Sequence, residues 1–261
     1  MSSRVAVITG GASGLGLAIA RALGSDGWSV ALLDANVQTL EASAEQLRAE
    51  GVDVEGFHAS VADAAEVDDA VARIIQRWTR IDALFANAGI SAGPGPSAGG
   101  RGIAEVDDAN WDYVLAVNLS GVMRSIRACV PHLTAAGGGS IVITSSSAAV
   151  RPTLWVGHAY TAAKAALIPL GKALAIELAD AGIRVNVIAP GAFVTDIGGG
   201  RLRDPQVARN MARTIPMQRL GDPGEVGDLA RFLAGDQSRY ISGAVISIDG
   251  ALVAGEYEPP A

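Results

Sequence analysis

The sequence predicts an α/β fold in which helices cover both faces of a doubly wound parallel sheet. Short apolar runs alternate with helix-length amphipathic stretches along the 261-residue chain, which is the element order of parallel strands joined by crossover helices. Most of these runs are apolar nearly throughout instead of alternating, as expected of strands covered on both faces. No repeat or linker divides the chain, so we expect one domain over residues 1–261.

Seven apolar runs are the expected strands, at Val5–Ile8, Ser29–Leu33, Val54–His58, Ala83–Ala86, Ser140–Thr144, Arg184–Ile188 and Val245–Ile248. The expected helical segments lie at Gly14–Leu23, Val37–Glu50, Ala64–Arg77, Asp108–Leu133, Ala159–Ala181 and Glu225–Ala234. In the third segment, Val67, Val71 and Ile74 recur at three- and four-residue spacing, which predicts a stripe that faces the core. Pro169 lies inside the fifth segment, where its missing N–H is expected to kink or loosen the helix.

Composition excludes several classes of protein. The chain is 49% hydrophobic and 18% charged, with a net charge of −7, which favours a large core and argues against a nucleic-acid partner. No run approaches the roughly 20 apolar residues of a membrane helix, and the N-terminus enters the first strand at once, so we expect no membrane span and no signal peptide. The single cysteine, Cys129, is expected in the core, and the expected location is the reducing cytoplasm.

A glycine-rich turn, Thr9–Gly16 (TGGASGLG), directly follows the first expected strand. Between a strand and a helix, such a turn lets backbone N–H groups point at a pyrophosphate. Gly10 permits the tight turn, Gly14 lets the backbone approach the phosphates, and Gly16 lets the helix pack on the strand. The spacing differs from the common G-x-G-x-x-G, so the indication of a dinucleotide comes mainly from the position of the turn.

Asp34 ends the second expected strand, at about the separation of the acidic residue that binds an adenosine ribose. A carboxylate there accepts hydrogen bonds from the 2′- and 3′-hydroxyls and repels a 2′-phosphate by roughly 1–4 kcal/mol. Positions 13 and 35 hold Ser13 and Ala35, so no basic residue there offsets this repulsion. Asp34 therefore predicts NAD over NADP, the alternative being that it only caps the next helix.

Tyr160 and Lys164 lie four residues apart in a helical segment, so they share one face. An unperturbed tyrosine has a pKa of about 10, and a neighbouring ammonium is expected to lower that pKa. The fifth expected strand leads into Ser145, Ser146 and Ser147, which places a hydroxyl beside the phenol. This arrangement predicts an enzyme in which a hydride moves to or from a nicotinamide while the tyrosine handles the proton.

In order along the chain, these motifs resemble the short-chain dehydrogenase/reductase family over almost the whole length. The matching segments are the glycine turn, Asp34, ANAG at 86–89, Asn118 in VNLSG, the serine strand, Tyr160 with Lys164, PGAFVT at 190–195 and IDG at 248–250. The resemblance implies a Rossmann-like sheet of strand order 3-2-1-4-5-6-7. It also implies an oxidoreductase that transfers a hydride between NAD(H) and a secondary alcohol or ketone, assembled as a homotetramer.

The resemblance also implies roles for individual residues. Tyr160 is expected to be the general acid/base, Lys164 to lower its pKa and bind the ribose, a serine to orient the substrate oxygen, and Asn118 to hold a relay water. No metal is expected. The expected dinucleotide-binding residues are Gly10, Ser13, Gly14, Leu15, Gly16, Asp34, Ser60, Val61, Asn87, Ala88, Gly89, Tyr160, Lys164, Pro190, Gly191, Phe193 and Thr195.

Two departures from the family pattern leave questions open. Ser60 and Val61 stand where the family usually has an aspartate near the adenine, and a serine accepts a hydrogen bond more weakly than a carboxylate. The motif match selects Ser146 as the catalytic serine, whereas the commonest family spacing from Tyr160 selects Ser147. We choose Ser146.

The substrate side is the least specified part of the sequence. Glycines at 198–200 open a polar stretch that we expect to form a mobile substrate lid around residues 196–219, whereas the tail at 256–261 is expected to be loosely held. Alternatives are a 3-oxoacyl or sugar/polyol enzyme of the same family, an epimerase or dehydratase on an extended fold, and a non-catalytic dinucleotide sensor. Candidate pocket residues are Ala148, Val150, Arg151, Trp155, His158, Phe193, Ile197 and Met211.

Overall fold

Seven parallel strands form one sheet in the order β3-β2-β1-β4-β5-β6-β7, as predicted. A computed structural model describes residues 3–91, 93–195 and 197–258. The runs of buried residues in β1, β2, β4 and β6 explain why these strands are apolar throughout. The strands are β1 Val5–Thr9, β2 Ser29–Asp34, β3 Val54–His58, β4 Ala83–Ala86, β5 Gly139–Thr144, β6 Ile183–Pro190 and β7 Val245–Ile248.

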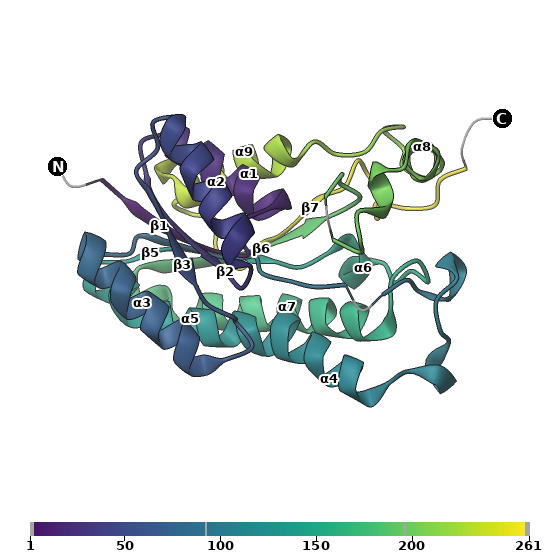
Figure 1. Cartoon of the computed structure of the whole chain (residues 1–261), viewed down its shortest axis with the longest axis horizontal. Coiled ribbons are helices and arrows are strands. Elements are labelled where there is room, and N and C mark those ends of the chain that lie inside the picture. Colours follow the sequence, from purple (N-terminus) through teal and green to yellow (C-terminus); the bar gives the residue numbers. More distant parts are fainter. Residues whose placement is uncertain (1–2, 92, 196, 259–261) are drawn as a thin grey trace.

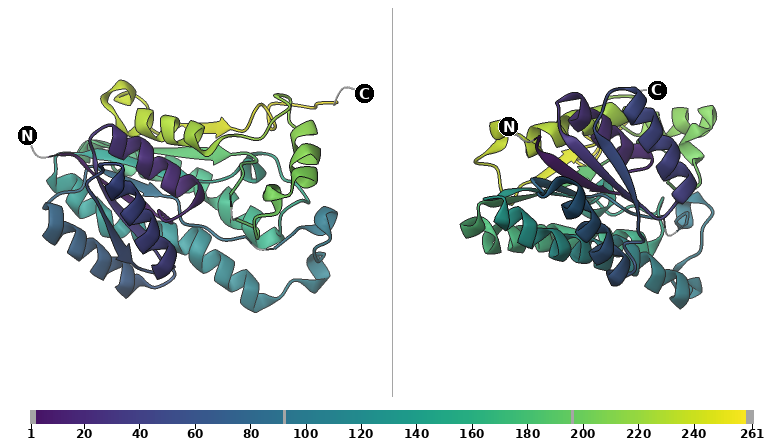
Figure 2. Two further views of the ribbon diagram at one scale, coloured as in Figure 1. Left: turned by 45° about the horizontal axis from the view of Figure 1, so that its top comes forward. Right: turned by 60° about the vertical axis from the view of Figure 1, so that its left-hand side comes forward.

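Helices cover both faces of this sheet (Figures 1 and 2). One face carries α1 (Gly14–Ser25), α2 (Val37–Ala49) and α9 (Pro223–Ala234), and the other carries α3 (Ala64–Trp78), α5 (Gly121–Ala135) and α7 (His158–Glu177). Each face has its own apolar core, and Phe57 on one side and Phe85 on the other are among the largest fully buried side chains. Cys129 lies in the first of these cores, where burial raises the pKa of its thiol to about 12.

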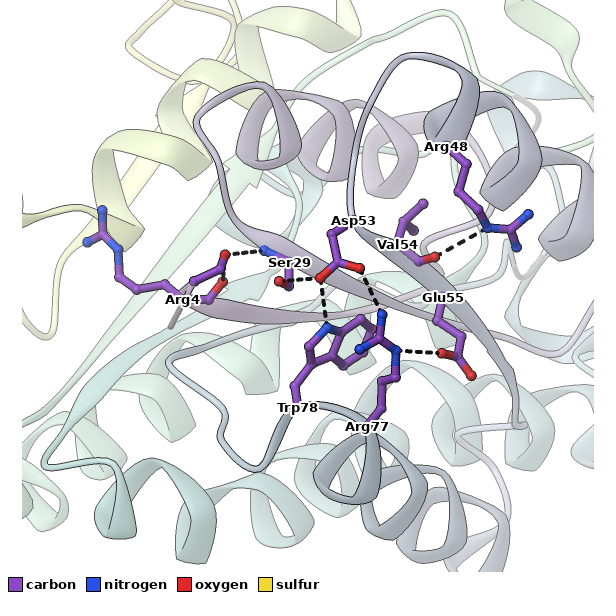
Figure 3. A network of polar contacts seen from close by, with 9 residues as sticks. Arg4, Ser29, Arg48, Asp53, Val54, Glu55, Arg77 and Trp78 are labelled. Atoms are coloured by element: carbon purple, nitrogen blue, oxygen red, sulfur yellow. Dashed lines mark hydrogen bonds and ion pairs between the residues drawn. The ribbon is translucent and has the colours of Figure 1, made fainter. Parts of the chain in front are cut away.

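The edge strand β3 is tied to α3 by a polar network around Asp53 (Figure 3). The Asp53 carboxylate accepts hydrogen bonds from the Ser29 hydroxyl at 2.6 Å, the Trp78 indole N–H at 2.8 Å and the Arg77 guanidinium at 3.0 Å. Arg77 also forms an ion pair with Glu55. These contacts fix the end of α3 against the edge of the sheet.

The expected helix Asp108–Leu133 is interrupted, which corrects the prediction. It consists of α4 (Asp108–Leu115), a π-helical turn (Ala116–Ser120) and α5. The Arg124 guanidinium donates hydrogen bonds to the carbonyl oxygens of Ala116 and Val61, at 3.1 and 3.3 Å. A π turn inserts one residue without changing the apolar character of the helix, so the periodicity did not indicate it.

Three further observations concern shorter segments. α7 continues through the exposed Pro169, so this residue does not end the helix, and the expected kink or loosening stays a prediction. Two short helices were not predicted, α6 (Ser147–Val150) and α8 (Pro205–Arg213), and α8 lies within the stretch expected to be a lid. Asp196, at the start of the expected lid, lies outside the described residues, as do 259–261 of the expected tail. Within the ranges that the structure describes, no helix has both the length and the apolarity to cross a membrane.

Candidate active site

A cavity of about 950 Å³ lies at the carboxyl ends of the strands, where open α/β sheets bind ligands. Segments that follow β1, β2, β4, β5 and β6 all contribute to its wall, together with α8 and the chain after β7. All of the expected site residues line this cavity except Gly16 and Asn118. The topology therefore gathers residues from across the chain around a single space.

The glycine turn is too tightly packed for side chains at two of its positions. Gly10 has φ +62°, and a Cβ there would lie 2.8 Å from the Cα of Ala88. A Cβ on Gly16 would lie 2.0 Å from the carbonyl oxygen of Gly10, so Gly16 supports the turn from behind. Ser13 forms no side-chain cap with α1, which leaves the N–H groups of the first turn beside the cavity for an anion.

Asp34 lies at the end of β2 on the cavity wall. Its carboxylate accepts hydrogen bonds from the backbone N–H groups of Asn36 at 3.0 Å and Ala12 at 3.2 Å. The helix α2 is capped by Asn36, whose side chain accepts from Thr39 N–H at 3.0 Å, so Asp34 is not its cap. The two backbone bonds orient the carboxylate beside the glycine turn.

Basic side chains are absent from this end of the cavity in the part of the chain that the structure describes. The basic residues that line the cavity are Lys164 on α7, Arg151 after α6 and Arg201 before α8. None of them belongs to β1, β2, β3 or the turns that follow these strands. The wall around Asp34 thus carries negative charge without a compensating guanidinium or ammonium.

Ser60 and Asn87 both line the cavity but also have structural bonds. The Ser60 hydroxyl accepts from Ala62 N–H at 3.3 Å, and the nearby carboxylate of Asp63 is committed to capping α3. The Asn87 amide donates to the carbonyl oxygen of Thr9 at 3.1 Å. Asn87 therefore joins the ends of β1 and β4, as expected of a residue that stabilises the central strands.

Asn118 is fully buried behind the cavity wall. Its side-chain oxygen accepts from Ile90 N–H and its amide donates to the Ile90 carbonyl, each at 2.8 Å. A Cβ on Gly89 would lie 3.1 Å from Lys164 Nζ and 3.3 Å from Asn118 Oδ1. Gly89 thus leaves the space in which the lysine and the asparagine approach each other.

Lys164 is buried, and only 2% of its surface is exposed. Its ammonium donates a hydrogen bond to the Thr144 carbonyl oxygen at 2.8 Å, at the end of β5. Burial lowers the pKa of Lys164 to about 8. The Ser145 hydroxyl donates to the Lys164 backbone carbonyl at 2.8 Å, which fixes α7 against the serine strand.

Tyr160 and Ser146 both line the cavity, and the Ser146 hydroxyl interacts with the phenol in the sense that lowers its pKa. Burial raises the pKa of Tyr160, and the interaction with Ser146 offsets only part of that rise. The lowering expected from Lys164 is therefore wrong for the protein without ligands. The Lys164 ammonium lies 6.0 Å from the centre of the phenol ring and is directed at Thr144, so desolvation dominates.

The segment after β6 closes the cavity beside the glycine turn. A Cβ on Gly191 would lie 2.7 Å from the Cβ of Asp249, so the chain after β7 passes directly behind it. The Phe193 ring is buried in the core against Gly221. The Thr195 side chain lies close to Gly14, where a Cβ would be 3.3 Å away. Pro190 at the end of β6 completes this wall.

The substrate end of the cavity is mostly apolar, and two candidates do not belong to it. Val150 and His158 are absent from the cavity wall, and His158 borders a smaller cavity of about 460 Å³. Sequence reasoning missed several residues of the wall, among them four whose segments it assigned to a helix face and to the C-terminal end of the chain. Those residues are Tyr113, Leu252, Val253 and Tyr257.

A helix-covered parallel sheet with its ligand cavity at a glycine turn defines the class of dinucleotide-binding oxidoreductases. Comparison with known proteins gives the particular group: the chain belongs to the short-chain dehydrogenase/reductase family. Residues 10–252 match a family model described as enoyl-(acyl carrier protein) reductase. The cavity and the fold thus agree with the resemblance found in the motifs.

Similar proteins match over nearly their whole length. The 2,5-dichloro-2,5-cyclohexadiene-1,4-diol dehydrogenase LinX of Sphingobium indicum is 37% identical over 251 residues, 96% of each chain. The 2-(R)-hydroxypropyl-CoM dehydrogenase of Xanthobacter autotrophicus is 37% identical over 254 residues, 97% of this chain and 99% of its own.

The fold is likewise shared with solved structures. That of levodione reductase superposes with a TM-score of 0.89 at 32% identity, covering 97% of this chain and 98% of its own. Similar solved structures include complexes with NADPH and with NADH. The chain is therefore an oxidoreductase with a nicotinamide dinucleotide cofactor and a small-molecule substrate, and the family alone does not choose between the two dinucleotides.

Proposed function

We propose that the chain transfers a hydride between NAD(H) and a secondary alcohol or ketone, with Tyr160 as the general acid/base. The observation that carries the proposal is that the Ser146 hydroxyl and the Tyr160 phenol share the cavity wall, where Ser146 lowers the pKa of the phenol. Two hydroxyls at one point can hold a carbinol or carbonyl oxygen between them. Ser147 lines the same cavity, but the contact with the phenol belongs to Ser146.

In this mechanism, the substrate oxygen binds to Ser146 and Tyr160, and the proton moves between that oxygen and the phenol. The bound nicotinamide supplies the hydride acceptor or donor. General acid/base catalysis of this kind contributes about 10²–10⁴-fold to the rate. Because burial raises the pKa of Tyr160, the phenol is protonated at neutral pH in the free protein, ready to donate in the reducing direction.

The buried residues behind the phenol support this step. Lys164 is held by the Thr144 carbonyl, and Gly89 leaves its ammonium free to approach the cavity. The proposed roles of Lys164 are to bind the ribose and to favour tyrosinate when the alcohol is oxidised. Asn118 fixes the segment at Ile90 near this ammonium through both polar atoms of its side chain, and the relay water at Asn118 is proposed from the family resemblance alone.

We propose NAD in preference to NADP because of the charge around Asp34. The fit of a dinucleotide rests on the glycine turn, where the backbone atoms around Gly10 and Gly16 leave no room for side chains. At the far end, the oriented Asp34 carboxylate suits ribose hydroxyls, and the neighbouring wall offers no basic side chain to a 2′-phosphate among the described residues. An NAD-linked enzyme favours catabolic oxidation over biosynthetic reduction.

The names of two relatives support a secondary alcohol as the substrate of this chain. LinX is named for a cyclohexadiene-1,4-diol and the Xanthobacter enzyme for a 2-hydroxypropyl group. A sensor without catalysis is disfavoured because Tyr160 and Lys164 are both present.

We also propose a cytoplasmic homotetramer assembled through α4, α5 and α7. Exposed Ile176 and Met123 on these helices support an interface, and light scattering of the purified protein tests it.

The test is the appearance of NADH absorbance with NAD, and separately with NADP, against secondary alcohols, polyols and cyclic diols. We expect turnover with NAD and a loss of at least 10²-fold in kcat in Tyr160→Phe, with dinucleotide binding retained. Undiminished turnover in Tyr160→Phe would refute the role of the phenol. Conversion of substrate without net absorbance change would indicate an epimerase instead.

A further inference from the structure

The chain after β7 passes over the substrate end of the cavity. This C-terminal strap, residues 249–257, runs beside α8 at the right of Figure 1 and in the left view of Figure 2. Leu252, Val253 and Tyr257 of the strap line the cavity, and Tyr257 is half-buried between exposed Glu256 and Glu258. Tyr257, within the tail expected to be loosely held, therefore forms part of the wall.

One anchor joins the strap to the helix that follows the catalytic serine. The Arg151 guanidinium donates hydrogen bonds to the carbonyl oxygens of Gly255 at 2.7 Å and Leu252 at 3.4 Å. The Asp249 carboxylate also accepts from the N–H groups of Ala251 and Val253, each at 3.0 Å. These bonds fold the strap into a compact turn and tie it to Arg151, which lies five residues after Ser146 in sequence.

A second anchor joins the strap to the end of the lid. The Gln218 side-chain amide donates a hydrogen bond to the Tyr257 hydroxyl. The same amide donates to the Ile215 carbonyl at 2.9 Å, and Met217 N–H donates to the Gly250 carbonyl at 3.3 Å. Gln218 is held at φ +55°, an unusual backbone conformation for a residue other than glycine. The strap thus fixes the point where the lid rejoins the core.

We propose that Tyr257 is a specificity-determining residue, which selects secondary alcohols that carry an apolar ring. The proposal rests on the proposed function. Leu252, Val253 and the Tyr257 ring face the same cavity as Trp155 and Met211, so this end offers apolar surface to a bulky substituent. The Arg151 guanidinium is directed at backbone carbonyls of the strap, so among the arginines of the described wall only Arg201 is left to meet a substrate carboxylate, and the comparison with lactate tests that contact.

The test compares the full-length wild type with Tyr257→Ala and Tyr257→Phe, using NAD with cyclohexanol, propan-2-ol and lactate. Tyr240→Ala is the matched control because Tyr240 is fully exposed. We expect the wild type to prefer cyclohexanol in kcat/KM. Tyr257→Ala should reduce the ratio of kcat/KM for cyclohexanol to kcat/KM for propan-2-ol at least tenfold, because the variant lacks the aromatic ring of the wall. Tyr257→Phe should raise KM for cyclohexanol about three- to tenfold with little change in kcat.

A second readout separates this proposal from the proposed function. Hydrogen exchange of residues 205–219 should be faster in Tyr257→Phe and Tyr257→Ala than in the wild type and Tyr240→Ala, whether or not a substrate is turned over. Faster exchange without turnover of any alcohol would overturn the proposed function but keep the strap as a support of the lid. The role of Tyr257 would be overturned if hydrogen exchange were unchanged in both variants and the kcat/KM ratio of cyclohexanol to propan-2-ol in Tyr257→Ala stayed within twofold of the wild type. A wild-type preference for lactate would overturn it too.

Discussion

Asp34 is the residue through which the choice of dinucleotide can be tested without knowing the substrate. Its carboxylate is fixed by two backbone N–H groups, at 3.0 and 3.2 Å, and faces no basic side chain on the described cavity wall near β1–β3. Two unit charges about 4 Å apart repel each other by ~1 kcal/mol in water and ~4 kcal/mol at an effective dielectric constant of 20. Removal of the charge should therefore improve NADPH binding by about 5- to 10³-fold.

The variant is Asp34→Asn, which keeps the shape and one backbone hydrogen bond. The assay is the Kd of NADH and of NADPH from cofactor fluorescence, with Asp26→Asn, on an exposed residue at the end of α1, as the control. We expect the wild type to bind NADH more tightly and the Kd ratio to shift toward NADPH in Asp34→Asn only. The reasoning would be refuted if the wild type preferred NADPH, or if the ratio of the two Kd values in Asp34→Asn stayed within twofold of the wild-type ratio.

Other expectations follow from the packing and the charges. Gly16→Ala should abolish NADH binding and destabilise the fold by about 1–3 kcal/mol because its Cβ would lie 2.0 Å from the Gly10 carbonyl, whereas Gly102→Ala, with open space, should not. Ser146→Ala should lower kcat about 10²-fold or more and Ser147→Ala should not, and equal losses would contradict the assignment. Despite its partial burial, the pKa of Asp53 is lowered by Ser29, Trp78 and Arg77. The contribution of Asp53 to the free energy of unfolding, about 1–2 kcal/mol, should thus be fully present above pH ~4 and be lost as the pH falls through the lowered pKa. Denaturation of Asp53→Asn against wild type should show a difference that shrinks below pH ~4, and a constant difference would contradict this.

The strands could be predicted from the sequence because each is a short apolar run that only a sheet covered on both faces can bury. The observed β3, β4 and β7 have the predicted bounds, and β6 extends the prediction by one residue at its start and two at its end. The same pattern could not reveal the π turn around Asn118, where Arg124 bonds the Ala116 carbonyl of the turn and the Val61 carbonyl of a distant segment. Local periodicity carries no information about such a partner.

The lid helix α8 was missed for a different reason. Its start is marked in the sequence by Asp204 and Pro205, and the Asp204 carboxylate accepts from the N–H groups of Gln206 and Val207. The polar composition of the surrounding stretch outweighed that signal. The strap was missed because Tyr257 acquires its position from Gln218 and its neighbours acquire theirs from Arg151, contacts that span 39 residues in one case and about a hundred in the other.

The pair Tyr160 and Lys164 shows how far a spacing argument reaches. Four-residue spacing brings both side chains to one face of α7, and the structure has them on the wall of one cavity. The spacing does not predict the direction of their pKa shifts. Burial favours the neutral form of each group, so it raises the pKa of the phenol and lowers the pKa of the ammonium. Tyrosinate must then be stabilised by more than Lys164 alone. A positively charged oxidised nicotinamide beside the phenol would act in that direction, so binding of NAD before the alcohol is the order that the electrostatics of this site favour.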